Sequence, residues 1–164
     1  MVADDHVRIA ELADRKEELY RELVKRDGIE PLPGVVALLE SLSGAGIPCS
    51  VGSSTPRANI DAIMDVIGLG ERFQAITAAE DVTEGKPDPQ VFLKAAEKVG
   101  AAPGESVVFE DAHVGIEARL AAGMKVIAVA TTHPIESLGD ADLAVASLEE
   151  VDSVTLESLL RDSA

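Results

Sequence analysis

The stretch Ser106–Gly123, SVVFEDAHVGIEARLAAG, decides the fold. Its apolar run Val107–Phe109 is typical of a strand buried on both faces, and it stops at two acids, Glu110 and Asp111. A helical segment rich in alanine follows, so the stretch predicts half of a βαβ unit. Ligands of open parallel sheets bind at the carboxyl ends of the strands. The two carboxylates therefore predict a site for a hard cation such as Mg²⁺, with solvated or helix-capping acids as the alternative.

The composition limits the class of protein and its partners. The 164 residues suffice for one domain with a core, and 46% of them are apolar. A net charge of −16 and an aromatic content of 2% argue against nucleic-acid binding, because phosphates are repelled and bases find no stacking surface. The same charge, and the lack of a long apolar run, argue against a membrane partner. Cys49 is the one cysteine, so no intrachain disulfide forms and we expect a cytoplasmic location.

The N-terminal part predicts a long amphipathic helix over residues 5–26. Apolar residues recur there at 3.6-residue spacing, and acid–base pairs lie four residues apart on the outer side. We expect the apolar face to dock on the chain's own domain, with a partner protein as the alternative. The segment Asp27–Gly34 contains two prolines and predicts a hinge, after which the pattern indicates a helix over 35–43 and a strand over 47–52.

A group of hydroxyl side chains, Ser53–Thr55, follows this predicted strand and precedes Pro56 and Arg57. Pro56 is suited to the first position of a helix, which we expect to run to Ile67. Backbone amides and hydroxyls at a helix N-terminus form a natural cradle for phosphate. Simple capping of the helix by a hydroxyl is the alternative.

A second candidate for anion binding is Lys86, in the loop Glu84–Pro89. Pro87 and Pro89 restrict the backbone on either side of it. Such restriction suits an ammonium that must point at a phosphate, whereas a lone lysine with no such task is solvated.

Taken in order, these features resemble the haloacid dehalogenase superfamily, in particular its β-phosphoglucomutase-like phosphatases and mutases. The features are the strand that ends at Ser53, the run GKPDPQVF from Gly85, and the run VVFEDAHVGIEAR from Val107. The resemblance covers about residues 14–151. It implies an α/β fold with a Rossmann-like three-layer core and a parallel sheet over residues 31–164, preceded by a remnant of the family's helical cap over residues 1–30.

The resemblance also implies roles for individual residues. In such enzymes the hydroxyl that matches Ser53 hydrogen-bonds the transferring phosphoryl group, and the ammonium that matches Lys86 neutralises its charge. Asp111 matches a direct Mg²⁺ ligand, and Glu110 matches an acid that supports the metal through water or a shared contact. The residues that match contacts to a distal phosphate or polar group of the substrate are Ser54, Thr55 and Arg57.

The sequence departs from the family at the family's first motif. No Asp-x-Asp follows an apolar strand, and the late Asp140-Ala141-Asp142 lies in a polar turn. In the family the first Asp is the nucleophile and the second is the general acid/base. We therefore expect both catalytic aspartates, the first (central) strand and most of the cap to be missing. Because uncatalysed phosphate-ester hydrolysis is so slow, we expect the chain to be a very poor phosphatase by itself.

The missing strand would lie between those that end at Ser53 and Glu110, leaving two unpaired edges. Direct closure of the gap, strand exchange in a homodimer, or a partner strand would satisfy these edges. We expect phosphoryl transfer on a small phosphorylated metabolite, with a non-catalytic phosphate- and Mg²⁺-binding or scaffold protein as the alternative. A generic nucleotide-binding domain is disfavoured, because no Gly-x-Gly-x-x-Gly or P-loop follows a strand.

Overall fold

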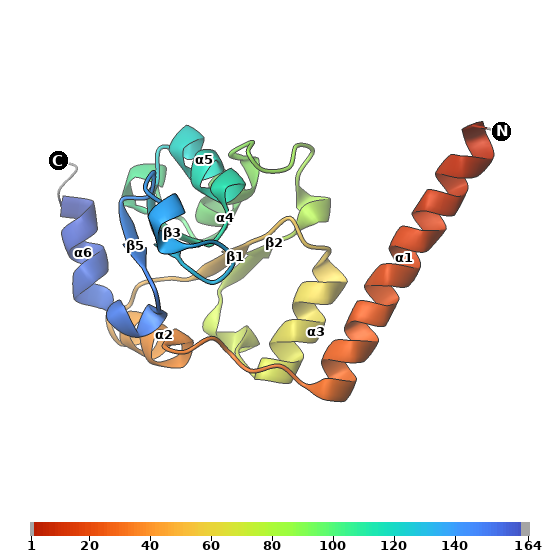
Figure 1. The fold of residues 1–164 in the computed structure, drawn as a ribbon. Coiled ribbons are helices and arrows are strands. Elements are labelled where there is room, and N and C mark those ends of the chain that lie inside the picture. Colours follow the sequence, from red (N-terminus) through yellow and green to blue (C-terminus); the bar gives the residue numbers. More distant parts are fainter. Residues whose placement is uncertain (1, 162–164) are drawn as a thin grey trace.

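The computed structural model describes residues 2–161, which form an α/β fold in which every paired strand is parallel (Figure 1). The helices are α1 (Val2–Asp27), α2 (Val35–Gly44), α3 (Arg57–Ile67), α4 (Gln90–Lys98), α5 (His113–Ala122) and α6 (Ser153–Arg161). The strands are β1 (Ser50–Gly52), β2 (Ala75–Thr77), β3 (Val107–Glu110), β4 (Lys125–Val129) and β5 (Leu143–Val145).

Three strands form a sheet in the order β3-β4-β5, and helices cover both of its faces. The central strand β4 explains this arrangement, because its side chains alternate between two cores. Val126 and Ala128 belong to a core with α4 and α5, whereas Ile127 and Val129 belong to a core with α2 and α6. The layers are thus helix, sheet and helix, which confirms the expected α/β class.

The other two strands, β1 and β2, form a separate parallel sheet in which Gly52 pairs with Thr77. Helix α4 packs against both strands and also against α5, so it joins the two sheets on one side. Within residues 2–161, no strand pairing connects β1 to β3. Direct closure of the gap by pairing of β1 with β3 is therefore not what the chain adopts.

Helix α1 is a long rod that lies beside α3 and extends away from the sheets at its N-terminal end (Figure 1). Its contact with α3 centres on the buried Asn59, which donates to Glu17 at 2.5 Å and accepts from Arg21 at 2.8 Å. The predicted apolar face of α1 is exposed, with Leu12 at 69%, and among residues 7–27 only Val24 is buried. Helix α1 thus packs on its own domain, as predicted, but it does so through Glu17 and Arg21 with Val24 buried nearby in the chain, and not through the predicted apolar face. Like every helix in the described part of the chain, α1 is not apolar enough over a sufficient length to cross a bilayer.

The hinge before α2 ends at a glycine whose conformation and surroundings are both demanding. Gly34 has φ of 87°, in the left-handed region that favours glycine. A Cβ at this position would overlap the backbone of Leu148 and Glu149. The hinge is therefore fixed at its end by close backbone approach to the C-terminal part of the chain.

Candidate active site

The carboxylate of Glu110 is held inside the protein at the carboxyl end of β3. Its Oε2 accepts hydrogen bonds from the backbone amides of Asp111, at 2.9 Å, and Ala112, at 3.1 Å. Its Oε1 pairs with the ammonium of Lys86. Gly115 in α5 makes room for this side chain, since a Cβ there would overlap the carboxyl group of Glu110. Two backbone amides and the Lys86 ammonium thus hold the Glu110 carboxylate, and the absence of a side chain at Gly115 leaves room for it.

Lys86 reaches Glu110 from the loop before α4, and both side chains are largely buried, with 15% and 8% of their surfaces exposed. The Lys86 ammonium also lies 4.5 Å from the centre of the Phe92 ring. A charge buried this far is tolerated because it is paired, and removing one partner of such a pair costs about 3–5 kcal/mol. Lys86 is therefore not a solvated lysine, which was the alternative that the sequence left open.

Asp111 faces the loop that follows β4. Its Oδ2 accepts hydrogen bonds from the hydroxyls of Thr131, at 3.1 Å, and Thr132. The rings of His113 and His133 lie beside this region with centroids 4.6 Å apart. Sequence reasoning had assigned none of these neighbours to the site. The available signal was their position after the carboxyl end of a buried strand, the same signal that identified Glu110 and Asp111.

Ser53 lies at the carboxyl end of β1, where its backbone amide donates to the carbonyl of Thr77 at 2.9 Å. Its Oγ accepts a hydrogen bond from the amide of Thr55 at 3.1 Å. Because this bond uses a lone pair of the hydroxyl, the Ser53 proton stays available to an anion. The geometry therefore suits a hydroxyl that donates to a phosphoryl oxygen.

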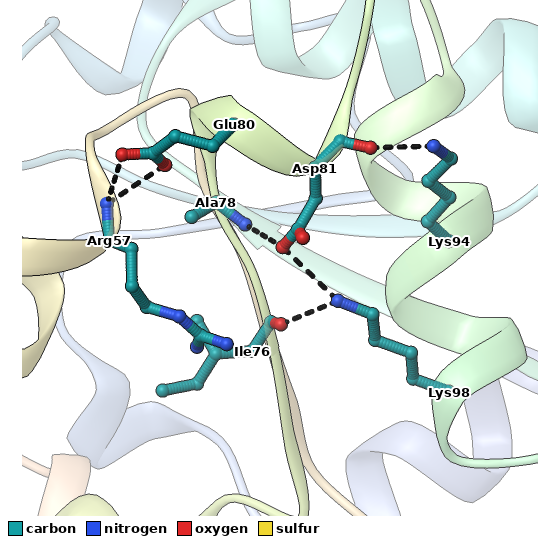
Figure 2. Close-up of polar contacts among 7 residues, drawn as sticks. All are labelled: Arg57, Ile76, Ala78, Glu80, Asp81, Lys94 and Lys98. Carbon is teal, nitrogen blue, oxygen red and sulfur yellow. Dashed lines mark hydrogen bonds and ion pairs between the residues drawn. The ribbon is translucent and has the colours of Figure 1, made fainter.

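The start of α3 differs from the expected phosphate cradle. The backbone amide of Arg57 donates to both oxygens of Glu80, at 3.1 and 3.0 Å, so a carboxylate of the protein already caps this helix (Figure 2). Pro56 is the residue before the helix and not its first member. Sequence reasoning missed Glu80 because it lies 23 residues from Arg57 along the chain.

Two lysines of α4 hold the segment that carries Glu80 (Figure 2). Lys94 donates to the carbonyl of Asp81 at 2.5 Å, and Lys98 donates to the carbonyl of Ile76 at 2.7 Å. Lys98 also pairs with the Asp81 carboxylate at 3.1 Å. The amide of Ala78 and the ammonium of Lys98 both lower the pKa of Asp81, the amide more strongly. This polar network ties the end of β2 to α4.

The structure thus brings Lys86, Glu110 and Asp111 together, whereas no direct contact joins Ser53, Ser54, Thr55 or Arg57 to them. Lys86 contacts Glu110 directly, and Asp111 is the next residue. Ser53 is connected less directly, because Gly52 before it packs against the Phe92 ring that lies under Lys86. A groove of about 800 Å³ on another part of the described surface, between the hinge, α2 and residues 148–152, contains none of the predicted site residues.

A family model described as "Haloacid dehalogenase-like hydrolase" matches residues 3–129. The chain belongs to the haloacid dehalogenase-like hydrolases. The chain is 36% identical over 156 residues to 5-amino-6-(5-phospho-D-ribitylamino)uracil phosphatase, chloroplastic, from Arabidopsis thaliana, covering 94% of this chain and 41% of that protein. It is 40% identical over 130 residues to hexitol phosphatase A from Escherichia coli (strain K12), covering 79% of this chain and 60% of that protein.

Among solved structures, the chain is similar to β-phosphoglucomutase from Clostridium difficile, with a TM-score of 0.84 and 25% identity. That match covers 94% of this chain and 67% of the other. These likenesses confirm the resemblance to β-phosphoglucomutase-like members that the sequence motifs indicated. The chain spans 41% and 60% of the length of the two curated relatives named above.

Glu110 and Asp111 fit a Mg²⁺ held by few protein ligands. Within residues 2–161, no three His, Cys, Asp or Glu side chains form a complete metal cage. Mg²⁺ commonly keeps several waters and takes one or two carboxylates together with substrate phosphate. Asp111 suits that role because its recorded hydrogen bonds use only Oδ2. Glu110 suits a supporting role, since Lys86 and two amides engage its oxygens.

Proposed function

We propose that this chain carries the phosphate- and Mg²⁺-binding part of a phosphatase or phosphomutase for small phosphorylated metabolites, such as sugar or polyol phosphates. Family membership and the phosphatases among its relatives support this proposal. The observation that carries it is the buried ammonium of Lys86 on Glu110, one residue from Asp111, at the carboxyl end of a parallel strand. A buried cation and a neighbouring carboxylate at such a place suit phosphoryl transfer, which relies on positioning and charge neutralisation.

Each predicted residue then has a task. Lys86 neutralises charge on the phosphoryl oxygens, and the Ser53 hydroxyl donates a hydrogen bond to one of them. Asp111 holds Mg²⁺, which when bound supplies positive charge opposite the same oxygens. Ser54, Thr55 and Arg57 lie beside Ser53 and are proposed to contact the rest of the substrate, with the Arg57 side chain, rather than its amide, making that contact because Glu80 takes the amide.

We also propose that the chain alone is a very poor catalyst. The sequence contains no apolar strand that ends in Asp-x-Asp, the motif that supplies the nucleophile in this family. Enzymes accelerate phosphate-monoester hydrolysis by up to ~10²¹. Variants without their nucleophile retain only about 10³–10⁴ over water, which leaves turnover negligible.

The direct test is titration of the protein with inorganic phosphate, with and without Mg²⁺, followed by calorimetry and ³¹P NMR. We expect phosphate to bind more tightly with Mg²⁺ than without. Asp111→Asn should remove the effect of Mg²⁺, Lys86→Met should weaken phosphate binding in both conditions, and the matched control Asp140→Asn should change neither. A wild-type protein that binds no phosphate contradicts the proposed site.

Turnover is measured on the same samples with hexitol and sugar phosphates. We expect rates indistinguishable from those of a buffer blank. Hydrolysis at rates typical of the family, lost in Asp111→Asn, would show that the chain is a complete catalyst and would refute the proposed inactivity.

A second candidate function is a phosphate- and Mg²⁺-binding scaffold without catalysis, which the missing Asp-x-Asp favours. Reading the DNA in frame upstream of Met1 separates the two. An apolar strand that ends in Asp-x-Asp favours the enzyme, and a stop codon just upstream favours the scaffold.

The open edges of β1 and β3 lead us to propose that a strand from elsewhere fills the gap, in a homodimer by strand exchange. Unpaired strand edges are ready templates for added strands. Size-exclusion chromatography with light scattering should show a dimer whose share rises with concentration, and a monomer at every concentration would refute exchange.

We propose a cytoplasmic location as well, because the single thiol, Cys49, is half-buried and burial raises its pKa, which suits a reduced and unreactive cysteine.

A further inference from the structure

One aromatic ring touches both halves of the proposed site. The Lys86 ammonium lies 4.5 Å from the centre of the Phe92 ring. Phe92 is 6% exposed, so the ring is shielded from water over nearly all of its surface. Aromatic residues make up only 2% of the chain, so few lysines can have an aromatic neighbour.

The same ring also contacts the strand that ends at Ser53. A Cβ on Gly52 would lie 3.2 Å from Cδ1 of Phe92 and 3.3 Å from Cβ of Ala95, so the Gly52 backbone rests directly on α4. Gly52 is the last residue of β1 and the neighbour of Ser53. Phe92 therefore lies between the backbone that carries the hydroxyl and the side chain that carries the cation.

We propose that Phe92 is a positioning residue of the phosphate site, which acts through Lys86; this inference rests on the function proposed above. The face of an aromatic ring attracts an ammonium, most strongly where water is excluded. A lysine side chain has four flexible carbons, and Glu110 alone constrains only its end. The ring gives the ammonium a second fixed neighbour, so that it faces the position next to Ser53 when phosphate arrives.

A purely structural role for Phe92 in the core predicts a different outcome. Leucine at this position fills much of the same volume and keeps the contact with Gly52 apolar, but it has no π face for the ammonium. A role in packing alone would appear as lower stability with unchanged phosphate affinity per folded molecule. A role through Lys86 requires that the effect on affinity disappears when Lys86 itself is absent.

The experiment is a double-mutant cycle of Phe92→Leu and Lys86→Met, read out by the affinity for inorganic phosphate in the presence of Mg²⁺. We expect Phe92→Leu to weaken binding about 3- to 30-fold, the range that a partly desolvated cation–π contact gives. In the Lys86→Met background the same change should have no further effect. Phe73→Leu is the matched control, since Phe73 is another of the three phenylalanines and touches neither Lys86 nor Gly52, and it should leave affinity unchanged.

A spectroscopic signal tests the placement without any ligand. Because the Lys86 Nζ lies 4.5 Å from the ring centre, we expect the neighbouring Cε protons to show an upfield ring-current shift in the NMR spectrum, which Phe92→Leu removes and Phe73→Leu keeps. If Phe92→Leu fails to fold, the ring-current shift in the wild-type protein and in Phe92→Tyr still tests whether the Lys86 ammonium lies on the ring.

The outcomes separate this inference from the proposed function. A wild-type protein that binds no phosphate refutes the proposed function, and this role falls with it. Three results would refute the role of Phe92 and leave the proposed function intact. Phosphate affinity could be unchanged in Phe92→Leu, Phe92→Leu could weaken binding equally when Lys86 is replaced, or the Lys86 protons could show no ring-current shift.

Discussion

The two sheets of this molecule are stabilised in different ways. The sheet β3-β4-β5 has a buried apolar core on each face, and four of the five residues of β4 are buried. In the sheet β1-β2, by contrast, every residue of β1 is only half-buried. There α4 supplies the packing, and its lysines hold the end of β2 through carbonyls and Asp81 (Figure 2).

The difference shows how the proposed site is assembled. Glu110 and Asp111 extend from the sheet with two apolar cores, whereas Ser53 extends from the sheet that depends on α4 and polar contacts. Regions with few buried apolar contacts open first in native proteins. We therefore expect the side of the site that carries Ser53 to open more readily than the side that carries Glu110 and Asp111. Helix α4 contacts both sides, so we expect it to keep them in place relative to each other.

The largest effect should follow truncation in the centre of the larger sheet. Ile127 is completely buried, and Ile127→Ala removes methyl groups that no neighbour can replace, which costs about 2–5 kcal/mol. The matched change Val51→Ala in the half-buried β1 should cost about 1 kcal/mol or less. Urea denaturation measures both, and equal losses would contradict the difference between the sheets.

A smaller effect is expected at the contact that fixes Glu110. Gly115→Ala places a Cβ where the Glu110 carboxyl group lies, so the side chain must move and its pairing with Lys86 must weaken. We expect a loss of about 1–3 kcal/mol in the free energy of unfolding, together with weaker phosphate binding. Gly104→Ala is the control, because no other atom lies near its added Cβ. Unchanged stability and phosphate affinity in Gly115→Ala would show that Glu110 is not fixed as described.

A gain is expected in the smaller sheet. Thr77 is completely buried, and its hydroxyl has no hydrogen-bond partner among the described residues. Valine has the same shape without the hydroxyl, so Thr77→Val should raise the free energy of unfolding by about 1 kcal/mol. Urea denaturation that shows a loss instead would indicate a partner for this hydroxyl.

The smallest effect concerns the pH dependence of the exposed Asp81. Its pKa is lowered in the folded state by the Ala78 amide and the Lys98 ammonium, so the unfolded state binds the proton first as the pH falls. The stabilisation is present above the ordinary aspartate pKa of about 3.9 and is lost as the pH falls through the lower folded value. Thermal unfolding of wild type and Asp81→Asn should differ slightly at pH 7 and converge in acid. A difference that grows in acid would contradict this sign.

Much of the fold could be predicted from sequence because local patterns carry it. The apolar run before Glu110 marked β3, an edge strand of the larger sheet, and the glycines and prolines marked the ends of the helices. Periodicity, however, shows which side chains share a face and not what covers that face. This is why the face through which α1 docks was predicted wrongly, since Asn59 lies far along the chain from Glu17 and Arg21.

The site divides in the same way. Ser53, Lys86 and Asp111 were recognisable because each follows a strand or lies in a restricted loop. The partners of the predicted site residues come from other segments of the chain. Thr132 donates to Asp111, and Glu80 accepts from the amide of Arg57. No short-range pattern reports such contacts, because they depend on which strand ends meet at one edge.

The close approach at Gly34 has a practical consequence for anyone who redesigns this protein. Residues 28–33 connect α1 to α2, and we expect a length change there to shift α1 against α3. Any side chain at position 34 instead separates the start of α2 from the turn at Leu148 and Glu149. A fusion protein that replaces the N-terminal helix with another module should therefore be joined upstream of Gly34. In a saturation library at position 34, we expect only glycine among the stable variants.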